Sequence, residues 1–287
     1  MQLAELRGHK QYADRAFSGL AIAAAGFVLL ILGMIALVMT RRAWPAFGEQ
    51  FFTSTRWSAA DKIFGALPFV WGTLYTAMIA IALALPISLG VALFITQVAP
   101  PWLRKPMVYL IDLLAVVPSV VFGLWGFLVL KNHFGLGLSY LTAGIILAIM
   151  ITPIITSLSR EVIETTPPSE KEAALALGAT RWEMIRASVL PHSKGGLVGA
   201  VMLGLGRAMG ETIAAALVIG SSPQITINPL ASGDSMPAVI ANQWGEADDP
   251  HKAALLALAV TLFVMTIAVN LAATAIVQRS MKRSRGA

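Results

Sequence analysis

Two charged residues lie inside an apolar stretch of this sequence, where a charge is costly. Between Leu197 and Ile219 the charged residues are Arg207 and Glu211. A charged side chain at the centre of a membrane helix costs about 2.5–3.5 kcal/mol even on the scale derived from insertion experiments, so such residues are usually partnered and functional. Arginine offers a permanent charge and a planar set of donors that suits an oxyanion. We therefore expect Arg207 to bind an anion.

The spacing of four residues places Glu211 one turn from Arg207 on the same face of a helix. Glu211 would then orient the guanidinium and lower the cost of its burial when no anion is bound. Thr212 would add a hydroxyl donor. These three residues are our candidates for substrate translocation. The alternative is a buried ion pair that only holds helices together, because buried pairs also occur for structural reasons.

Residues that favour close helix packing or kinks surround this pair and recur along the chain. Small residues precede and flank the two charges: Gly196, Gly199, Ala200, Gly204, Gly206, Ala208 and Gly210. They predict a surface for close helix approach. Prolines interrupt other apolar stretches at Pro86, Pro118 and Pro153. A kink frees backbone groups that must face protein or water rather than lipid, so Pro118 and Ser119 are candidates for a gate.

Catalytic and metal-binding patterns are missing from the sequence. No Gly-Lys dipeptide occurs, so the chain has no Walker A loop with which to hold ATP. The four histidines are scattered without a His-Glu-x-x-His pattern, and cysteine is absent. We expect no catalytic residue, no metal site, no cofactor and no disulfide in this chain.

The composition indicates a membrane protein. Of 287 residues, 57% are hydrophobic and 13% are charged, against about 25% charged in an average soluble domain. Apolar stretches long enough to cross the hydrocarbon layer predict six helical spans. Their approximate ranges are 18–39, 69–94, 108–130, 138–158, 197–219 and 253–277. The predicted fold is an all-α, polytopic bundle in contact with lipid.

The positive charges predict the orientation. Of the 21 Lys and Arg residues, 14 lie in the segments on one side of the six spans and 6 on the other, with Arg207 between them. Cytoplasmic loops carry the excess of Lys and Arg, so both termini are expected in the cytoplasm. The net charge of +6 therefore reflects topology, and no nucleic-acid partner is expected.

The long inner connection, about residues 159–194, carries the clearest local signals. Pro167-Pro168 suits the entry to a helix, and the stretch from Ser169 to Glu172 has the pattern of a capping box. Gly178 then predicts a helix stop, and the stretch from Thr180 to Glu183 forms a second capping box. We expect two short helices that meet at Gly178. The simpler alternative is a plain loop between two spans.

This connection resembles the EAA loop of ABC importer permeases. Glu172-Ala173-Ala174, Gly178 and Leu190-Pro191 match that pattern, while Ser188 departs from the Ile that the family often has. The resemblance implies a type I ABC importer permease fold. It also implies that Glu172, Ala173, Ala174 and Gly178 contact a cytoplasmic ATPase subunit.

Three other segments resemble the permeases of phosphate (Pst) importers, of the PstC type. They are residues 111–126, the Gly206–Thr212 stretch followed by Val218-Ile219-Gly220, and residues 240–247, where Trp244 replaces the usual Phe. The likeness covers about residues 64–280. It implies phosphate import by alternating access in the bacterial inner membrane. The implied partners are a PstA-like second permease, two ATP-binding subunits that bind the ATP, and an extracytoplasmic phosphate-binding protein.

The expected organisation has three parts, and two other functions stay open. Residues 1–63 hold the first span and an outer amphipathic loop, 64–280 the permease core, and 281–287 a cytoplasmic tail. Another oxyanion such as molybdate or sulfate would also suit an arginine site. An ATP-independent channel or an intramembrane enzyme would need no ATPase partner.

Overall fold

The computed structural model describes the backbone of residues 2–285 and the side chains of residues 17–275. Its first half contains α1 (Gln2–Ala43), η1 (Trp44–Ala46), α2 (Glu49–Thr53), β1 (Trp57–Ser58), β2 (Ile63–Phe64), α3 (Leu67–Leu93), η2 (Phe94–Val98), α4 (Pro101–Val116), α5 (Ser119–Trp125) and η3 (Gly126–Lys131). The second half contains α6 (Tyr140–Glu164), α7 (Pro168–Ala176), α8 (Arg181–Met184), η4 (Ile185–Val189), α9 (Leu190–Gly210), α10 (Ile213–Val218), α11 (Met236–Gln243) and α12 (Asp249–Arg285). The predicted all-α bundle is confirmed.

The centre of the bundle is α6, which packs against α3 on one side and α9 on the other. Its buried side chains include Ile146, Leu147, Ile151 and Ile155. The glycines of α9 divide into two groups. A Cβ on Gly204 would lie 2.6 Å from Ile155, so this glycine is required for contact with α6. A Cβ on Gly199 would meet no atom within 4 Å, so that face of α9 is open.

Four helical segments of the described chain are long and apolar enough to cross a membrane. They are Phe17–Ala46, Leu67–Val98, Tyr140–Glu164 and Asp249–Ala275. A fifth is formed if α4 and the segment Ser119–Lys131 are taken together, although these two are bent by 90°. The predicted span 197–219 is also broken, because α9 ends at Gly210 and α10 begins at Ile213. Two of the six predicted spans are therefore interrupted helices.

The bend between α4 and α5 has a local cause. Pro118 disfavours a helical conformation at the residue before it, and Val117 leaves the helical conformation with ψ 128°. The break after α9 lies at Glu211, which is extended with ψ 125°. The helices that follow the two interruptions pack against each other, since a Cβ on Gly123 of α5 would lie 2.8 Å from Cα of Ala214 in α10.

The outer connections carry more structure than predicted. The 40–68 region holds η1, α2 and an antiparallel β1–β2 hairpin that pairs Trp57 with Phe64. Trp57 also packs edge-on against Phe69 at the start of α3. The region between the predicted spans 197–219 and 253–277 contains α11.

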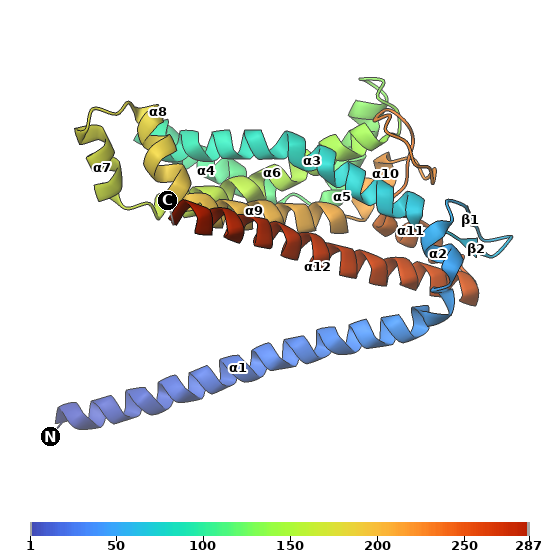
Figure 1. Ribbon diagram of the computed structural model, residues 1–287, viewed down its shortest axis with the longest axis horizontal. Helices are drawn as coiled ribbons and strands as arrows, with labels where there is room; N and C mark the ends of the chain where they lie inside the picture. The colour runs from blue at the N-terminus through green and yellow to red at the C-terminus, as the bar shows by residue number, and fades with distance from the viewer. Residues whose placement is uncertain (1, 286–287) are drawn as a thin grey trace.

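The molecule has two distinct ends (Figure 1). Helices α7 and α8 lie at one end, together with the last turns of α12, whereas α2, β1, β2 and α11 lie at the other. Helix α1 contacts α12 near its own C-terminal end and diverges from the bundle along the rest of its length. Helix α12 continues without interruption through residues 281–285 of the predicted tail, and residues 286–287 lie outside the described residues.

Candidate functional site

Arg207 lies in the last turn of α9 and is exposed on the surface of the bundle. It lines a pocket of about 570 Å³ that is otherwise formed by α6, α9 and α12. The other lining residues are Ile154, Gly199, Met202, Leu203, Gly206 and Asn270. The open glycine face of α9 therefore forms one wall of this pocket. No ion pair of Arg207 is found among the described side chains.

Glu211 does not occupy the position that the sequence predicted. Because α9 ends at Gly210, Glu211 is no longer one helical turn from Arg207 on a shared face. Its Oε1 accepts a hydrogen bond of 3.3 Å from the backbone N–H of Ala214, in the first turn of α10. The expected Arg207–Glu211 pair is absent from the ion pairs of the described residues. This part of the prediction was wrong, since four-residue spacing pairs side chains only in an unbroken helix.

Thr212 also differs from the expected arrangement. Its hydroxyl donates to the carbonyl oxygen of Gly210 at 3.3 Å, and the residue is not among those lining the pocket. Of the three predicted translocation residues, the structure places only Arg207 in the pocket. Asn270 of α12 was missed. The signal that pointed to it was a lone amide within the apolar stretch 253–277.

The inner connection forms the predicted pair of short helices, α7 and α8. Gly178 has a φ of +86°, a left-handed conformation that glycine adopts at little cost. The second capping box is confirmed: the Thr180 hydroxyl accepts from Glu183 N at 3.3 Å, and Glu183 Oε2 accepts from Thr180 N at 2.8 Å. The backbone N–H of Thr180, and then its hydroxyl, lower the pKa of Glu183.

The first predicted capping box does not form. Helix α7 begins at Pro168, so Pro167 rather than Ser169 is its N-cap, and no side chain caps it. Proline suits this first helical position because its missing N–H would be unpaired there in any case. Glu172 and Ala173 are exposed, and Ala174 packs against the small cluster that includes Ile185 and Val189.

The α7–α8 unit is attached to the start of α9 and presents apolar side chains outward. His192 Nδ1 lies 3.5 Å from Glu170 Oε2, and Ser188 Oγ donates to the Glu170 carbonyl at 3.3 Å. Leu177 is 90% exposed and Trp182 is 61% exposed. The unit is thus a fixed platform with uncovered apolar residues at its tip.

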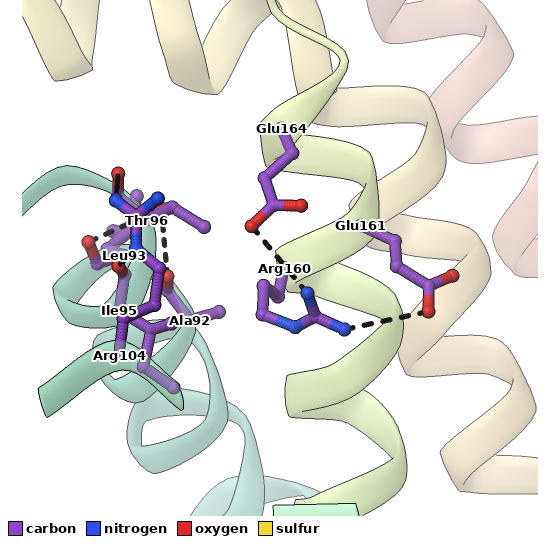
Figure 2. Close-up of polar contacts among 8 residues, drawn as sticks. All are labelled: Ala92, Leu93, Ile95, Thr96, Arg104, Arg160, Glu161 and Glu164. Atoms are coloured by element: carbon purple, nitrogen blue, oxygen red, sulfur yellow. Dashed lines mark hydrogen bonds and ion pairs between the residues drawn. The ribbon is translucent and has the colours of Figure 1, made fainter. Parts of the chain in front are cut away.

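The neighbouring helix ends carry a second set of polar contacts (Figure 2). At the end of α6, Arg160 pairs with Glu164 at 3.6 Å and with Glu161 at 3.8 Å. Arg104 of α4 donates to the carbonyls of Ile95 and Thr96, each at 3.0 Å. Arg104 thus binds carbonyls of η2, which follows α3, and Arg160 binds carboxylates at the end of α6, so both stabilise the end of the bundle that carries α7 and α8.

Pro118 and Ser119 lie at the 90° bend between α4 and α5. Pro118 is exposed and Ser119 half-buried. Both are outside the Arg207 pocket, so the structure does not bring the predicted gate and the predicted anion site together. Among the described residues, no three His, Cys, Asp or Glu side chains gather where a metal ion would bind.

A family model described as the inner membrane component of binding-protein-dependent transport systems matches residues 84–282. The match includes the pocket and the α7–α8 unit. The chain belongs to this permease family. Together with its apolar helices, this membership makes the chain a multi-pass inner membrane protein.

Curated relatives and solved structures agree with this assignment. The phosphate transport system permease protein PstC of Xylella fastidiosa Temecula1 is 43% identical, covering 90% of this chain and 88% of the relative. The PstC protein of Haemophilus influenzae is 39% identical, covering 91% of this chain and 90% of the relative.

A bacterial alginate ABC transporter, solved with a periplasmic protein bound to an alginate pentasaccharide, contains a similar chain with a TM-score of 0.68. It is 17% identical over 94% of this chain and 96% of that one. A chain of the inward-facing MetNI methionine ABC transporter matches with a TM-score of 0.59 at 16% identity, covering 76% of this chain and 94% of that one. The predicted fold of a type I ABC importer permease is therefore confirmed.

Proposed function

We propose that this chain is the membrane-spanning permease subunit of an ATP-driven importer of inorganic phosphate, and that Arg207 contacts the anion during transport. The assignment of the anion site rests on the exposed guanidinium of Arg207. It lines a pocket in a membrane-spanning bundle and has no counter-ion among the described side chains. Such a charge is costly unless a partner compensates it. A transported anion is that partner.

Phosphate suits a single arginine for two physical reasons. The planar guanidinium donates two parallel hydrogen bonds to two oxygens of a tetrahedral oxyanion. One cation also binds more weakly than a cluster, and a transported ion must leave the site as readily as it enters. Glu211 and Thr212, at the break that follows α9, act on the site indirectly through the position of α10.

In this proposal the α7–α8 unit contacts the ATP-binding subunits that drive transport. Its exposed surface includes or adjoins Glu172, Ala173, Ala174 and the turn at Gly178. Leu177 and Trp182 add exposed apolar side chains that would fit a cleft on the ATP-binding subunit. A cytoplasmic pair of ATP-binding subunits holds the ATP, so this chain needs no cofactor. A PstA-like permease completes the pathway, and an extracytoplasmic phosphate-binding protein delivers the anion.

The orientation follows from charge and shape together. The α7–α8 unit and the end of α12 share one end of the molecule, and α1 starts toward the same side (Figure 1). The excess of Lys and Arg in the corresponding segments supports a cytoplasmic location for that end. Alternating access then exposes the Arg207 pocket to each side in turn, and the bend at Pro118 and Ser119 is where α5 moves relative to α4.

Transport measurements test this function. Cells that lack their own phosphate permease are given this chain together with its partner subunits, and uptake of labelled phosphate is measured with sulfate or molybdate as competitors. We expect restored uptake that excess phosphate abolishes and the other anions do not, and an ATP-binding subunit that copurifies with the chain. Uptake without such a subunit would identify a channel instead, and preferential competition by sulfate or molybdate would identify a different oxyanion importer.

A further inference from the structure

We propose that a pocket formed by α1, α2, β2 and α12 binds a phospholipid whose zwitterionic headgroup carries a primary ammonium, as in phosphatidylethanolamine. The pocket has a volume of about 590 Å³, within the range of about 300–1,000 Å³ that is typical of sites for small ligands. It lies at the end of the bundle opposite α7 and α8 (Figure 1). It shares no lining residue with the pocket of Arg207, so this inference goes beyond the proposed anion site.

Four charged side chains line this pocket, two of each sign. The cations are Arg42, in the last turn of α1, and Lys62, which immediately precedes β2. The anions are Glu49, at the start of α2, and Asp249, at the start of α12. All four are exposed, and none forms an ion pair among the described side chains. Opposite charges are thus held apart around an open space, and a ligand that bridges them carries both signs itself.

The position of the pocket indicates a lipid rather than a soluble zwitterion. Arg42 and Asp249 lie at the adjoining ends of the first and last membrane-spanning segments of the described chain, at the level where headgroups meet the hydrocarbon layer. Toward the membrane centre, three apolar residues continue the face of α1 that carries the guanidinium, at intervals of three or four positions. They are Val38, Ile35 and Ile31, each 37–50% exposed. An acyl chain can run along this face from a headgroup in the pocket.

The walls of the pocket strengthen its electrostatic contacts. Phe51 is 1% exposed and lies beneath the charged rim, and Pro45, Phe64, Pro250 and Ala253 add further apolar surface. Apolar walls lower the effective dielectric constant, so an ion pair formed beside them is stronger than one in open water. The pocket therefore combines an apolar base with charges of both signs, as an amphipathic, zwitterionic ligand requires.

The chemistry of the four charges selects among headgroups. Arg42 and Lys62 donate hydrogen bonds to phosphate oxygens. Glu49 and Asp249 accept hydrogen bonds from a primary ammonium, which has three N–H donors. Choline has the same charge but no N–H group, and a glycerol headgroup or inorganic phosphate offers the carboxylates no cation. We therefore expect phosphatidylethanolamine to bind better than phosphatidylcholine, phosphatidylglycerol or free phosphate.

A thiol reporter in the pocket provides the test, because the chain contains no cysteine. Gln50 is exposed and lines the pocket, so Gln50→Cys is introduced into the full chain purified with its partner subunits. Its labelling rate by a maleimide, relative to the rate without ligand, is measured in detergent micelles with increasing mole fractions of each phospholipid, and separately with inorganic phosphate alone. The titrations are repeated with Glu49→Gln and Asp249→Asn together. Arg56→Gln is the matched control, because its ion pair with Asp61 lies on the same hairpin outside the pocket.

We expect phosphatidylethanolamine to protect the thiol at a lower mole fraction than phosphatidylcholine or phosphatidylglycerol. In the double carboxylate variant, the mole fraction that halves the labelling rate rises about tenfold, equivalent to about 1.4 kcal/mol, and the preference over phosphatidylcholine is lost. Arg56→Gln leaves both unchanged. Equal protection by phosphatidylethanolamine and phosphatidylcholine, or an unchanged preference in the double variant, would overturn the inference. Protection by inorganic phosphate alone would also overturn it, because the pocket would then bind the free anion rather than a lipid.

Discussion

The turn at Gly178 allows a backbone effect to be separated from a packing effect. Its φ is +86°, yet a Cβ at this position would meet no atom within 4 Å. Substitution therefore introduces strain without a clash. A left-handed conformation costs an L-residue about 1–2 kcal/mol, and a β-branched residue more. An energy of that size lowers the population of the native turn about 5- to 30-fold.

We expect a graded series at this position. Gly178→Asn is tolerated best, because asparagine adopts left-handed conformations more readily than other residues. Gly178→Ala has an intermediate effect, and Gly178→Val abolishes most ATPase association while membrane insertion survives. The measurements are copurification of the ATP-binding subunit and phosphate uptake normalised to inserted protein.

Gly245→Val is the matched control, because Gly245 also has open space around it but no positive φ. If Gly178→Val binds and couples the ATPase as well as Gly245→Val does, the role assigned to this turn is incorrect.

Two further predictions concern the topology and the outer loop. A single cysteine at Leu230 should react with an impermeant label from outside, and one at Trp182 only after permeabilisation; outside access at Trp182 would overturn the orientation. Burial raises the pKa of Asp234 to about 7, although the Ser235 N–H opposes that rise. The folded state thus holds this proton more tightly than the unfolded state, so stability should fall by about 1.4 kcal/mol per unit between about pH 4 and 7. Asp234→Asn should flatten that part of the pH profile of thermal unfolding in detergent, and an unchanged profile would show that Asp234 is not responsible.

Much of the helical bundle was predictable, because apolar length and charge placement are local properties of the sequence. The α7–α8 unit was predictable for the same reason: the Thr180–Glu183 capping box and the left-handed Gly178 each depend on a few adjacent residues. The sequence did not reveal that α9 stops at Gly210. No proline marks that position, and an unbroken helix was assumed through Glu211.

The pocket could be predicted only in part, because it depends on contacts between distant helices. Arg207 stood out as a charge in an apolar stretch. Asn270 became significant only when α12 was placed beside Gly206. The Arg207–Glu211 pair failed because the four-residue rule requires one continuous helix. A prediction of side-chain pairing is thus only as reliable as the helix boundaries on which it rests.

The central claim, that Arg207 meets the transported anion, is tested most directly by phosphate uptake in charge variants, normalised to inserted protein. Arg207→Gln should abolish uptake, and Arg207→Lys should lose much of it, because an ammonium lacks the bidentate fork. Adding Glu211→Gln to the Arg207→Gln variant should not restore phosphate uptake. Arg56→Gln, at an exposed ion pair of the outer hairpin, is the matched control and should transport normally. Near-normal uptake by the Arg207→Gln, Glu211→Gln double variant would contradict the account and leave the two charges with a packing role.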